Sequence, residues 1–160
     1  MSSGKTYWGK QVSQKLDMPF FDLDGQVVVS EGKSINEIFE KDGEEYFRQK
    51  EKEVLHILTE SRDTFVIACG GGTPCYYNNI DYMNRSGVTV WINTPMDILF
   101  ERLQKQRAQR PLLRKLTDEQ LKGFIIKKFS DRKIYYEQAK VIVDDETILV
   151  DSFVEKIFNA

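Results

Sequence analysis

The sequence predicts an α/β fold in which helices cover a parallel sheet. Short apolar runs of strand length alternate with helical patterns along the 160 residues. These runs are continuously apolar, which is typical of strands that are buried on both faces. Polar and glycine-rich segments follow the runs, at the strand ends where a parallel sheet binds its ligands. Such strand–helix–strand units cross over right-handed, and the length suits a single domain over 1–160.

The composition is that of an ordinary globular protein, with 41% hydrophobic and 30% charged residues. A formal net charge of −2 gives the whole molecule no attraction to nucleic acid or to an anionic membrane. No apolar run is long enough to span a bilayer, and we expect no signal peptide because the N-terminal residues are polar. Two cysteines and one histidine are too few for a Cys/His zinc site. We therefore expect a cytoplasmic monomer that binds neither nucleic acid nor membrane.

The chain begins with the second half of a phosphate-binding loop. Gly4, Lys5 and Thr6 match the end of the pattern G-x-x-x-x-G-K-[ST]. In such a loop, backbone N–H groups and the positive end of the following helix point at phosphate oxygens. Lys5 would add a charge on the outer phosphates, and the Thr6 hydroxyl would bind magnesium. The first glycine of the pattern and the strand before it would fall ahead of Met1.

Hydrophobic periodicity predicts the other elements. Residues 7–17 form the first expected helix, because Trp8, Val12 and Leu16 recur on one face at four-residue spacing. The expected strands are 20–24, 64–69, 88–92 and 140–144. The expected later helices begin near 34 and then cover 44–61, 80–85, 94–104, 117–138 and 151–157.

Capping residues mark several of these helix starts. Ser34 and Glu37 have the spacing of a capping box. Thr94 is the expected N-cap of its helix, with proline at the first helical position. Thr117 and Asp151 are expected to cap the last two helices.

Two polar segments follow the first two expected strands. We expect Asp22 and Asp24 to face different parts of the site, one toward the phosphate loop and its magnesium, the other toward a separate pocket. A polar turn is the alternative interpretation. Gly70, Gly71 and Gly72 end the next strand and let the backbone approach a ligand closely. The alternative here is a plain flexible turn, although one glycine would suffice for it.

The basic residues also allow two interpretations each, one functional and one of a solvated surface. Arg48 and Glu51 are three apart on one helix face, so Glu51 can orient the guanidinium toward a carboxylate, but a solvated surface pair fits equally well. Residues 102–115 contain six basic residues and no acid. This segment is either a solvated face or a closing lid. In a lid, Arg110 beside the rigid turn 111–113 would bring positive charge onto a transferring phosphate.

Together these stretches resemble the shikimate kinase family. The matching segments keep the family's order across nearly the whole chain, at 3–6, 19–24, 32–39, 43–51, 66–72 and 110–113. The resemblance implies a P-loop kinase three-layer sandwich with a parallel sheet in the order 2-3-1-4-5. It also implies that the chain transfers the γ-phosphate of ATP to the 3-hydroxyl of shikimate, with Mg²⁺, in aromatic amino-acid biosynthesis. A substrate-binding helical segment is expected at 25–61 and a lid at 104–116.

The family's central first strand has no counterpart in this sequence. Its absence would leave rows of unpaired backbone groups in the sheet, and each costs about 1–3 kcal/mol when buried. The sum would exceed the net stability of a domain, which is roughly 5–15 kcal/mol. We therefore expect Met1 to be internal, with the natural chain beginning about ten residues earlier, where the loop pattern would be complete.

The resemblance also implies roles for particular residues. The residues expected to bind ATP are Ser2, Ser3, Gly4, Lys5, Thr6, Tyr7 and Arg110. The residues expected to bind shikimate are Asp24, Arg48, Gly70, Gly71, Gly72 and Arg132. Thr6 and Asp22 are the expected magnesium ligands, with Lys5, Asp24 and Arg110 as the catalytic residues. Asp24 would accept the proton of the substrate hydroxyl, and Glu51 would orient Arg48. Either Arg102 or Arg107 would contact adenine.

Two other functions remain open at this point. One is a related kinase of a small hydroxy acid such as gluconate, which Asp22, Asp24 and the position of Arg48 make less favourable. The other is a relative that binds ligand without turnover, because half of the phosphate loop is missing.

Overall fold

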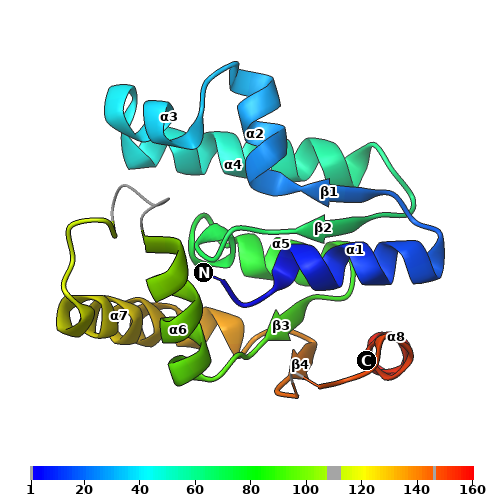
Figure 1. The fold of residues 1–160 in the computed structure, drawn as a ribbon. Helices are drawn as coiled ribbons and strands as arrows, with labels where there is room; N and C mark the ends of the chain where they lie inside the picture. Colours follow the sequence, from blue (N-terminus) through cyan, green and yellow to red (C-terminus); the bar gives the residue numbers. More distant parts are fainter. Residues whose placement is uncertain (1, 108–112, 146) are drawn as a thin grey trace.

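The computed structural model describes residues 2–107, 113–145 and 147–160. Its helices are α1 (Lys5–Leu16), α2 (Leu23–Glu31), α3 (Ile35–Lys41), α4 (Gly43–Glu60), α5 (Asn79–Ser86), α6 (Met96–Gln106), α7 (Asp118–Tyr136) and α8 (Val150–Phe158), with a 3-10 turn, η1, at Thr73–Cys75. Its strands are β1 (Phe20–Asp22), β2 (Val66–Ala68), β3 (Val90–Ile92) and β4 (Val141–Val143). The predicted helices and strands follow one another in the predicted order, and the helix α2, which was not among the expected helices, is added after β1 (Figure 1). Within the described ranges, no helix is long and apolar enough to cross a membrane.

The strands pair in parallel, as the sequence pattern predicts, and the pairs agree with the order that the resemblance implies. β1 pairs with β2, with Phe20 opposite Val66, and β3 pairs with β4, with Val90 opposite Val141. Across the residues that the structure describes, these are two separate two-stranded sheets. Each pair corresponds to neighbours in the family order 2-3-1-4-5, namely strands 2 and 3 and strands 4 and 5. The prediction of this fold with its first strand absent is confirmed.

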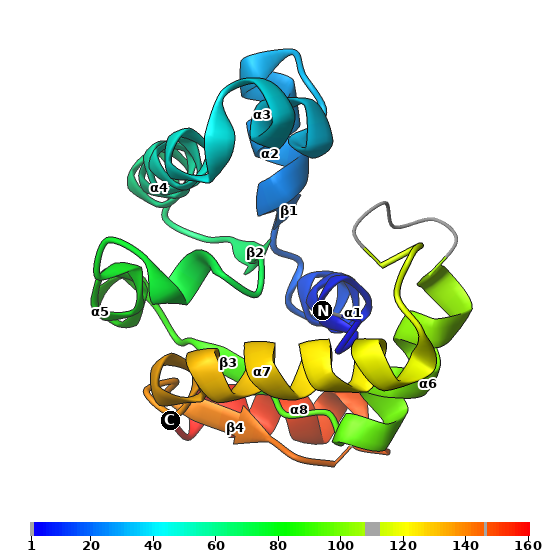
Figure 2. The same ribbon diagram turned by 90° about the vertical axis from the view of Figure 1, so that its left-hand side faces the viewer.

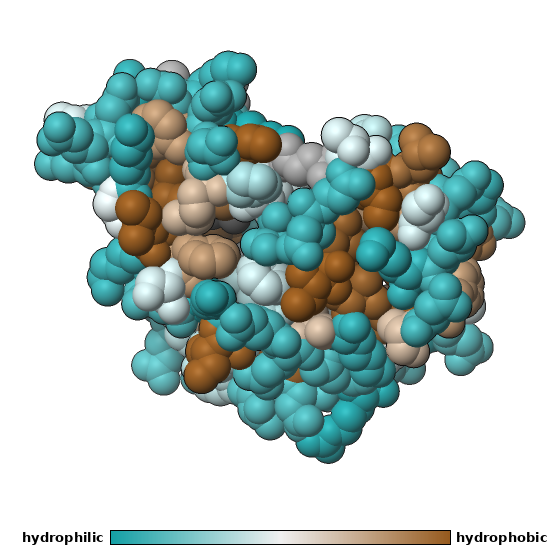
Figure 3. All heavy atoms as spheres, turned by 90° about the horizontal axis from the view of Figure 1, so that it is seen from below, coloured by the Kyte–Doolittle hydropathy of each residue, from teal (hydrophilic) through white to brown (hydrophobic). Residues whose placement is uncertain are grey.

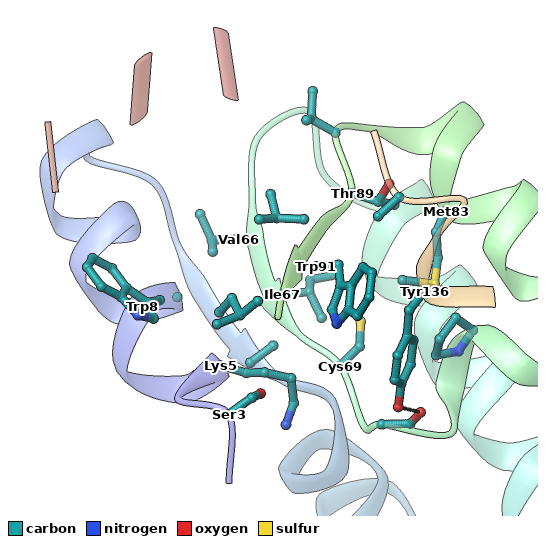
Figure 4. A pocket seen from close by; sticks show the side chains of 18 of the residues that line it. Ser3, Lys5, Trp8, Val66, Ile67, Cys69, Met83, Thr89, Trp91 and Tyr136 are labelled. Atoms are coloured by element: carbon teal, nitrogen blue, oxygen red, sulfur yellow. Dashed lines mark hydrogen bonds between the residues drawn. The ribbon is translucent and has the colours of Figure 1, made fainter. Parts of the chain in front are cut away.

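A cavity of about 540 Å³ lies between β2 and β3. Val66 and Ile67 line it from β2, and Trp91 lines it from β3 (Figure 4). The walls are apolar because both strands carry continuous apolar runs. The cavity lies where the family order places its first strand, and the Lys5 side chain lies at its edge.

Buried apolar side chains in the described part of the chain form three clusters. The first joins α2, α3 and α4 through residues such as Leu23 and Leu55. The second joins α1, β4 and α8, where Trp8 stacks on Phe153 with 4.9 Å between ring centroids. The third joins α6 and α7 around Leu121. Figure 2 shows the same division, with α2, α3 and α4 together on one side of β1 and with α6, α7 and α8 around β3 and β4.

Polar and charged side chains cover much of the lower face of the molecule (Figure 3). Figure 3 shows this face largely hydrophilic, with apolar side chains gathered between the charged ones. Scattered exposed apolar groups such as Leu149 are normal on a folded protein, because polar atoms cannot cover the whole surface.

The capping predictions were right for two helices and wrong for two. Ser34 and Thr117 each form the predicted capping box. Thr94 does not cap α6, because its hydroxyl donates to the Ser3 carbonyl at 3.2 Å, and Pro95 occupies the N-cap position. Asp151 lies inside the first turn of α8, where it pairs with Lys15.

The predicted strand around the two aspartates is shorter than expected. β1 ends at Asp22, whose Oδ1 accepts a hydrogen bond from the Gly25 N–H at 3.2 Å and so caps α2. Asp24 therefore lies in the first turn of α2 and not on a strand. Residues two apart on a regular strand point to the same face, so the pleat would not separate the two carboxylates. The start of α2 places Asp22 against Thr6 and Asp24 beside Gly70.

Candidate active site

The N-terminal segment has the local structure of a phosphate-binding loop. Gly4 is the N-cap of α1 and has φ 91°, a left-handed conformation that favours glycine because it lacks Cβ. Lys5 is the first helical residue, and the Trp8 N–H donates to the Gly4 carbonyl at 2.9 Å. The first N–H groups of a helix have no intrahelical acceptor and carry its positive dipole end. An anion at this position would meet backbone N–H groups and Lys5 together.

A second cavity, of about 470 Å³, borders this loop. Residues 2–8 form one wall. Segments that follow β3 and β4 form the rest together with α6, contributing Asn93, Thr94, Asp145, Arg102 and Gln106. The cavity therefore joins the loop to strand ends that are distant in the sequence, as the predicted architecture requires.

The structure distinguishes between the two arginines proposed to contact adenine. Arg102 lines the 470 Å³ cavity and donates to the Ser2 carbonyl at 3.2 Å. Arg107 donates to the Leu116 carbonyl at 2.9 Å and pairs with Asp118. Arg102, and not Arg107, therefore borders the phosphate loop.

Thr6 and Asp22 meet where the loop approaches the end of β1. The Thr6 hydroxyl donates to Asp22 Oδ2 at 3.3 Å. A hydroxyl and a carboxylate oxygen suit Mg²⁺, which prefers hard oxygen ligands and completes its shell with water and substrate phosphates. The predicted pair thus has the chemistry and the proximity to hold this ion.

Arg48 is buried although it carries a charge. Only 7% of it is exposed, and its Nη1 donates to Glu51 Oε2 at 2.9 Å. On its outer edge, Nε and Nη2 lie 3.4 and 3.3 Å from Glu44 Oε1. The guanidinium carbon lies 4.4 Å from the centre of the Tyr76 ring. Burying a charge is costly unless it is paired, so this arrangement excludes the solvated surface pair.

The glycine triplet packs directly against these charged groups. A Cβ on Gly72 would lie 2.5 Å from Nη2 of Arg48. A Cβ on Gly70 would lie 3.0 Å from Glu51 Oε1 and 3.3 Å from Asp24 Oδ1. A side chain at position 72 would therefore displace the Arg48 guanidinium, and one at position 70 would press on Glu51, so these two glycines do more than form a flexible turn.

Asp24 lies between the two halves of the site. Burial raises the pKa of its carboxyl, and the nearby Asp22 carboxylate raises it further. The positive charges of Lys5 and Arg48 act in the opposite direction. One carboxylate is thus within electrostatic range of the phosphate loop and of the buried guanidinium.

Arg132 reaches the same region from α7. Burial raises the pKa of the Cys75 thiol, and Arg132 and Arg48 both oppose this rise. The Tyr136 hydroxyl, one turn along α7, donates to the Gly71 carbonyl at 2.6 Å. The two arginines expected to bind shikimate therefore both lie near the glycine triplet.

The comparisons with known proteins agree with this geometry. The family model described as shikimate kinase matches residues 1–160. The chain belongs to the shikimate kinase family. A shikimate kinase from Bacteroides thetaiotaomicron is 40% identical over 148 residues, which cover 92% of this chain and 84% of the relative. One from Flavobacterium psychrophilum is 39% identical over 150 residues, covering 92% and 87%.

Solved shikimate kinases share the fold of this family member. The crystal structure of the Bacteroides thetaiotaomicron enzyme superposes with a TM-score of 0.89 at 37% identity, covering 99% of this chain and 92% of that one. The Acinetobacter baumannii enzyme, solved in complex with shikimate, gives 0.80 at 31% identity, covering 99% and 87%. The predictions of family, fold and kinase class are therefore confirmed, and the family implies ATP as a substrate.

Some residues of this shikimate kinase site were not predicted from the sequence, and one predicted residue lies outside the described part of the chain. Sequence reasoning did not find Thr73, Tyr76 or Tyr136. Thr73 directly follows the glycine triplet, and this adjacency was its one sequence signal. Arg110 lies outside the described residues, as does the middle of the predicted lid, so both stay predictions.

Proposed function

We propose that this protein transfers the γ-phosphate of ATP to the 3-hydroxyl of shikimate. The observation that carries the proposal is the position of Asp24. Its Oδ1 lies beside Gly70, next to the Glu51 that binds Arg48. Asp22, two residues earlier, binds Thr6 of the phosphate loop. A coupled assay of ADP formation with shikimate tests it, with gluconate as the competing acceptor. Turnover with gluconate alone would favour the related kinase. Binding of shikimate in calorimetry without ADP formation would indicate the non-catalytic relative. The monomeric state and the cytoplasmic location stay predictions.

On the nucleotide side, the loop residues Ser2 to Tyr7 are proposed to hold the phosphates. Lys5 supplies positive charge to the outer phosphates, and the helix α1 adds its dipole. Thr6 and Asp22 would hold Mg²⁺, which when bound neutralises charge on the β- and γ-phosphates. Arg102 would contact the nucleotide from α6.

On the acceptor side, Arg48 and Arg132 are proposed to bind the carboxylate of shikimate. Glu51 orients Arg48, and the backbone at 70–72 borders the substrate. Asp24 takes the proton of the 3-hydroxyl while that oxygen bonds to the γ-phosphorus and the bond to ADP breaks. Positioning and charge dominate phosphoryl transfer, so these groups need no covalent intermediate.

The Asp24→Asn variant is expected to lose roughly 10²–10⁴-fold in kcat, the size of a general base contribution. In the wild type, kcat should fall as the pH drops through the raised pKa of Asp24, because only the carboxylate accepts a proton. This acid limb should lie above the range of an ordinary aspartate and should be missing in the variant. Profiles of kcat against pH measure both effects. Wild-type turnover by the variant would remove Asp24 as the base.

The Gly72→Ala variant is expected to lower kcat/KM for shikimate roughly 10²-fold, as displacements of about 1 Å do. The new Cβ would displace the Arg48 guanidinium, whereas the backbone at φ −92° tolerates alanine. KM for ATP should change little. Gly123→Ala is the matched control, because its Cβ meets nothing within 4 Å. Equal kinetics for the two variants would contradict the close approach.

A further inference from the structure

A chain of buried polar side chains lies behind Arg48. The Thr73 hydroxyl donates to Glu51 Oε1 at 2.6 Å, and the other oxygen, Oε2, accepts from Arg48 Nη1 at 2.9 Å. Asn79 Nδ2 donates to the backbone carbonyl of Thr73 at 2.9 Å. Thr73 and Glu51 are both 0% exposed, and Asn79 is 1% exposed. These contacts connect the turn η1 to the helix α4.

The two oxygens of the Glu51 carboxylate accept hydrogen bonds from different donors, Thr73 and Arg48. At 2.6 Å the Thr73 bond has the length of a charge-assisted O–H···O⁻ bond. It occupies Oε1, so Oε2 alone takes Nη1 of Arg48. Without this donor, a buried oxygen would lose its partner, and the carboxylate would turn toward a second N–H of Arg48.

The orientation of Glu51 decides which edge of Arg48 faces outward. Nη1 is held on the buried side, and Nε and Nη2 form the opposite edge. That edge now contacts the half-exposed Glu44, so it is the edge that an incoming carboxylate can reach. It is also an edge with two parallel N–H donors, the geometry that binds carboxylates in a bidentate manner.

We propose that Thr73 is a positioning residue for shikimate: its hydroxyl holds Glu51 so that Arg48 keeps its two-donor edge toward the substrate carboxylate. Asn79 supports this role because it fixes the backbone of the turn that carries Thr73. The proposal rests on the proposed function, since it assumes that Arg48 binds the carboxylate of shikimate. Thr73 itself need not touch the substrate.

The test compares Thr73→Val, which removes the hydroxyl and keeps the branched shape, with Thr73→Ser, which keeps the hydroxyl. Calorimetry should give Thr73→Val a Kd for shikimate about tenfold weaker, or about 1.4 kcal/mol. Its KM for ATP should stay within about twofold, which is no more than roughly 0.4 kcal/mol. Thr73→Ser should restore the wild-type Kd. Thr73→Ala serves the same comparison if the valine variant does not fold.

Thr59→Val is the matched control on α4. Its hydroxyl donates to the Leu55 carbonyl at 3.0 Å and contacts the Tyr82 hydroxyl, away from Arg48. We expect this variant to change thermal stability alone. Wild-type shikimate affinity in Thr73→Val and Thr73→Ala would overturn the positioning role. If the wild-type protein itself does not bind shikimate, it is the proposed function that fails.

Discussion

The Lys5→Ala variant is expected to lose turnover almost completely while it still binds shikimate. Lys5 lines the cavity beside the phosphate loop, and its charge also lowers the pKa of Asp24. Removing one pre-positioned donor from a developing negative charge costs on the order of 10²–10³-fold in kcat. The charge on Lys5 would act on the transferring phosphate, where positive charge is the main source of catalysis. ADP formation at saturating substrates measures the loss, and calorimetry with shikimate measures the retained binding.

The matched control for Lys5 is Lys10→Ala. Both lysines lie on α1, but Lys10 is exposed and does not line the cavity. It should leave kcat and both KM values unchanged. Near-normal turnover in Lys5→Ala would show that the N-terminal segment does not act on phosphate, despite its loop-like geometry. An equal loss of shikimate affinity would show instead that the variant disturbs the whole site.

Much of the fold was predictable because its signals are local. The capping boxes at Ser34 and Thr117 depend on residues three positions apart, and strand runs carry their own apolar pattern. Thr94 was mispredicted because a partner 91 residues away, the Ser3 carbonyl, takes its hydroxyl. The end of β1 was mispredicted because Asp22 caps a helix that the apolar pattern did not reveal. A long-range partner therefore explains the error at Thr94, but not the error at the end of β1.

The candidate site was harder to predict, because the same spacing of two residues can occur at a buried position or at an exposed one. The pair Arg48 and Glu51 would look the same in sequence on a solvated helix face. Its burial comes from the glycine triplet and from Tyr76, which pack on it from another part of the chain. Arg102 and Arg107 likewise belong to one basic run, and only the fold separates the cavity wall from the pair with Asp118.

The Arg48→Ala variant is expected to weaken shikimate binding by about 2–5 kcal/mol, the cost of truncating one partner of a buried charge pair. This corresponds to a Kd that is roughly 30-fold to several thousand-fold weaker. Two effects add: the substrate carboxylate loses its two donors, and Glu51 remains buried without its cation. Calorimetry with shikimate measures the affinity, and thermal unfolding measures the accompanying loss of stability.

Two further variants separate these effects. Arg48→Lys keeps the positive charge but loses the planar fork, so a large part of the affinity should still be lost if the two-donor edge matters. Arg85→Ala removes an exposed arginine from an i,i+4 pair with Asp81, where surface ion pairs contribute little. It should bind shikimate normally. Unchanged affinity in Arg48→Ala would remove Arg48 from the site, and with it the reason for burying Glu51 and for a glycine at position 72, because both serve to hold this guanidinium in place.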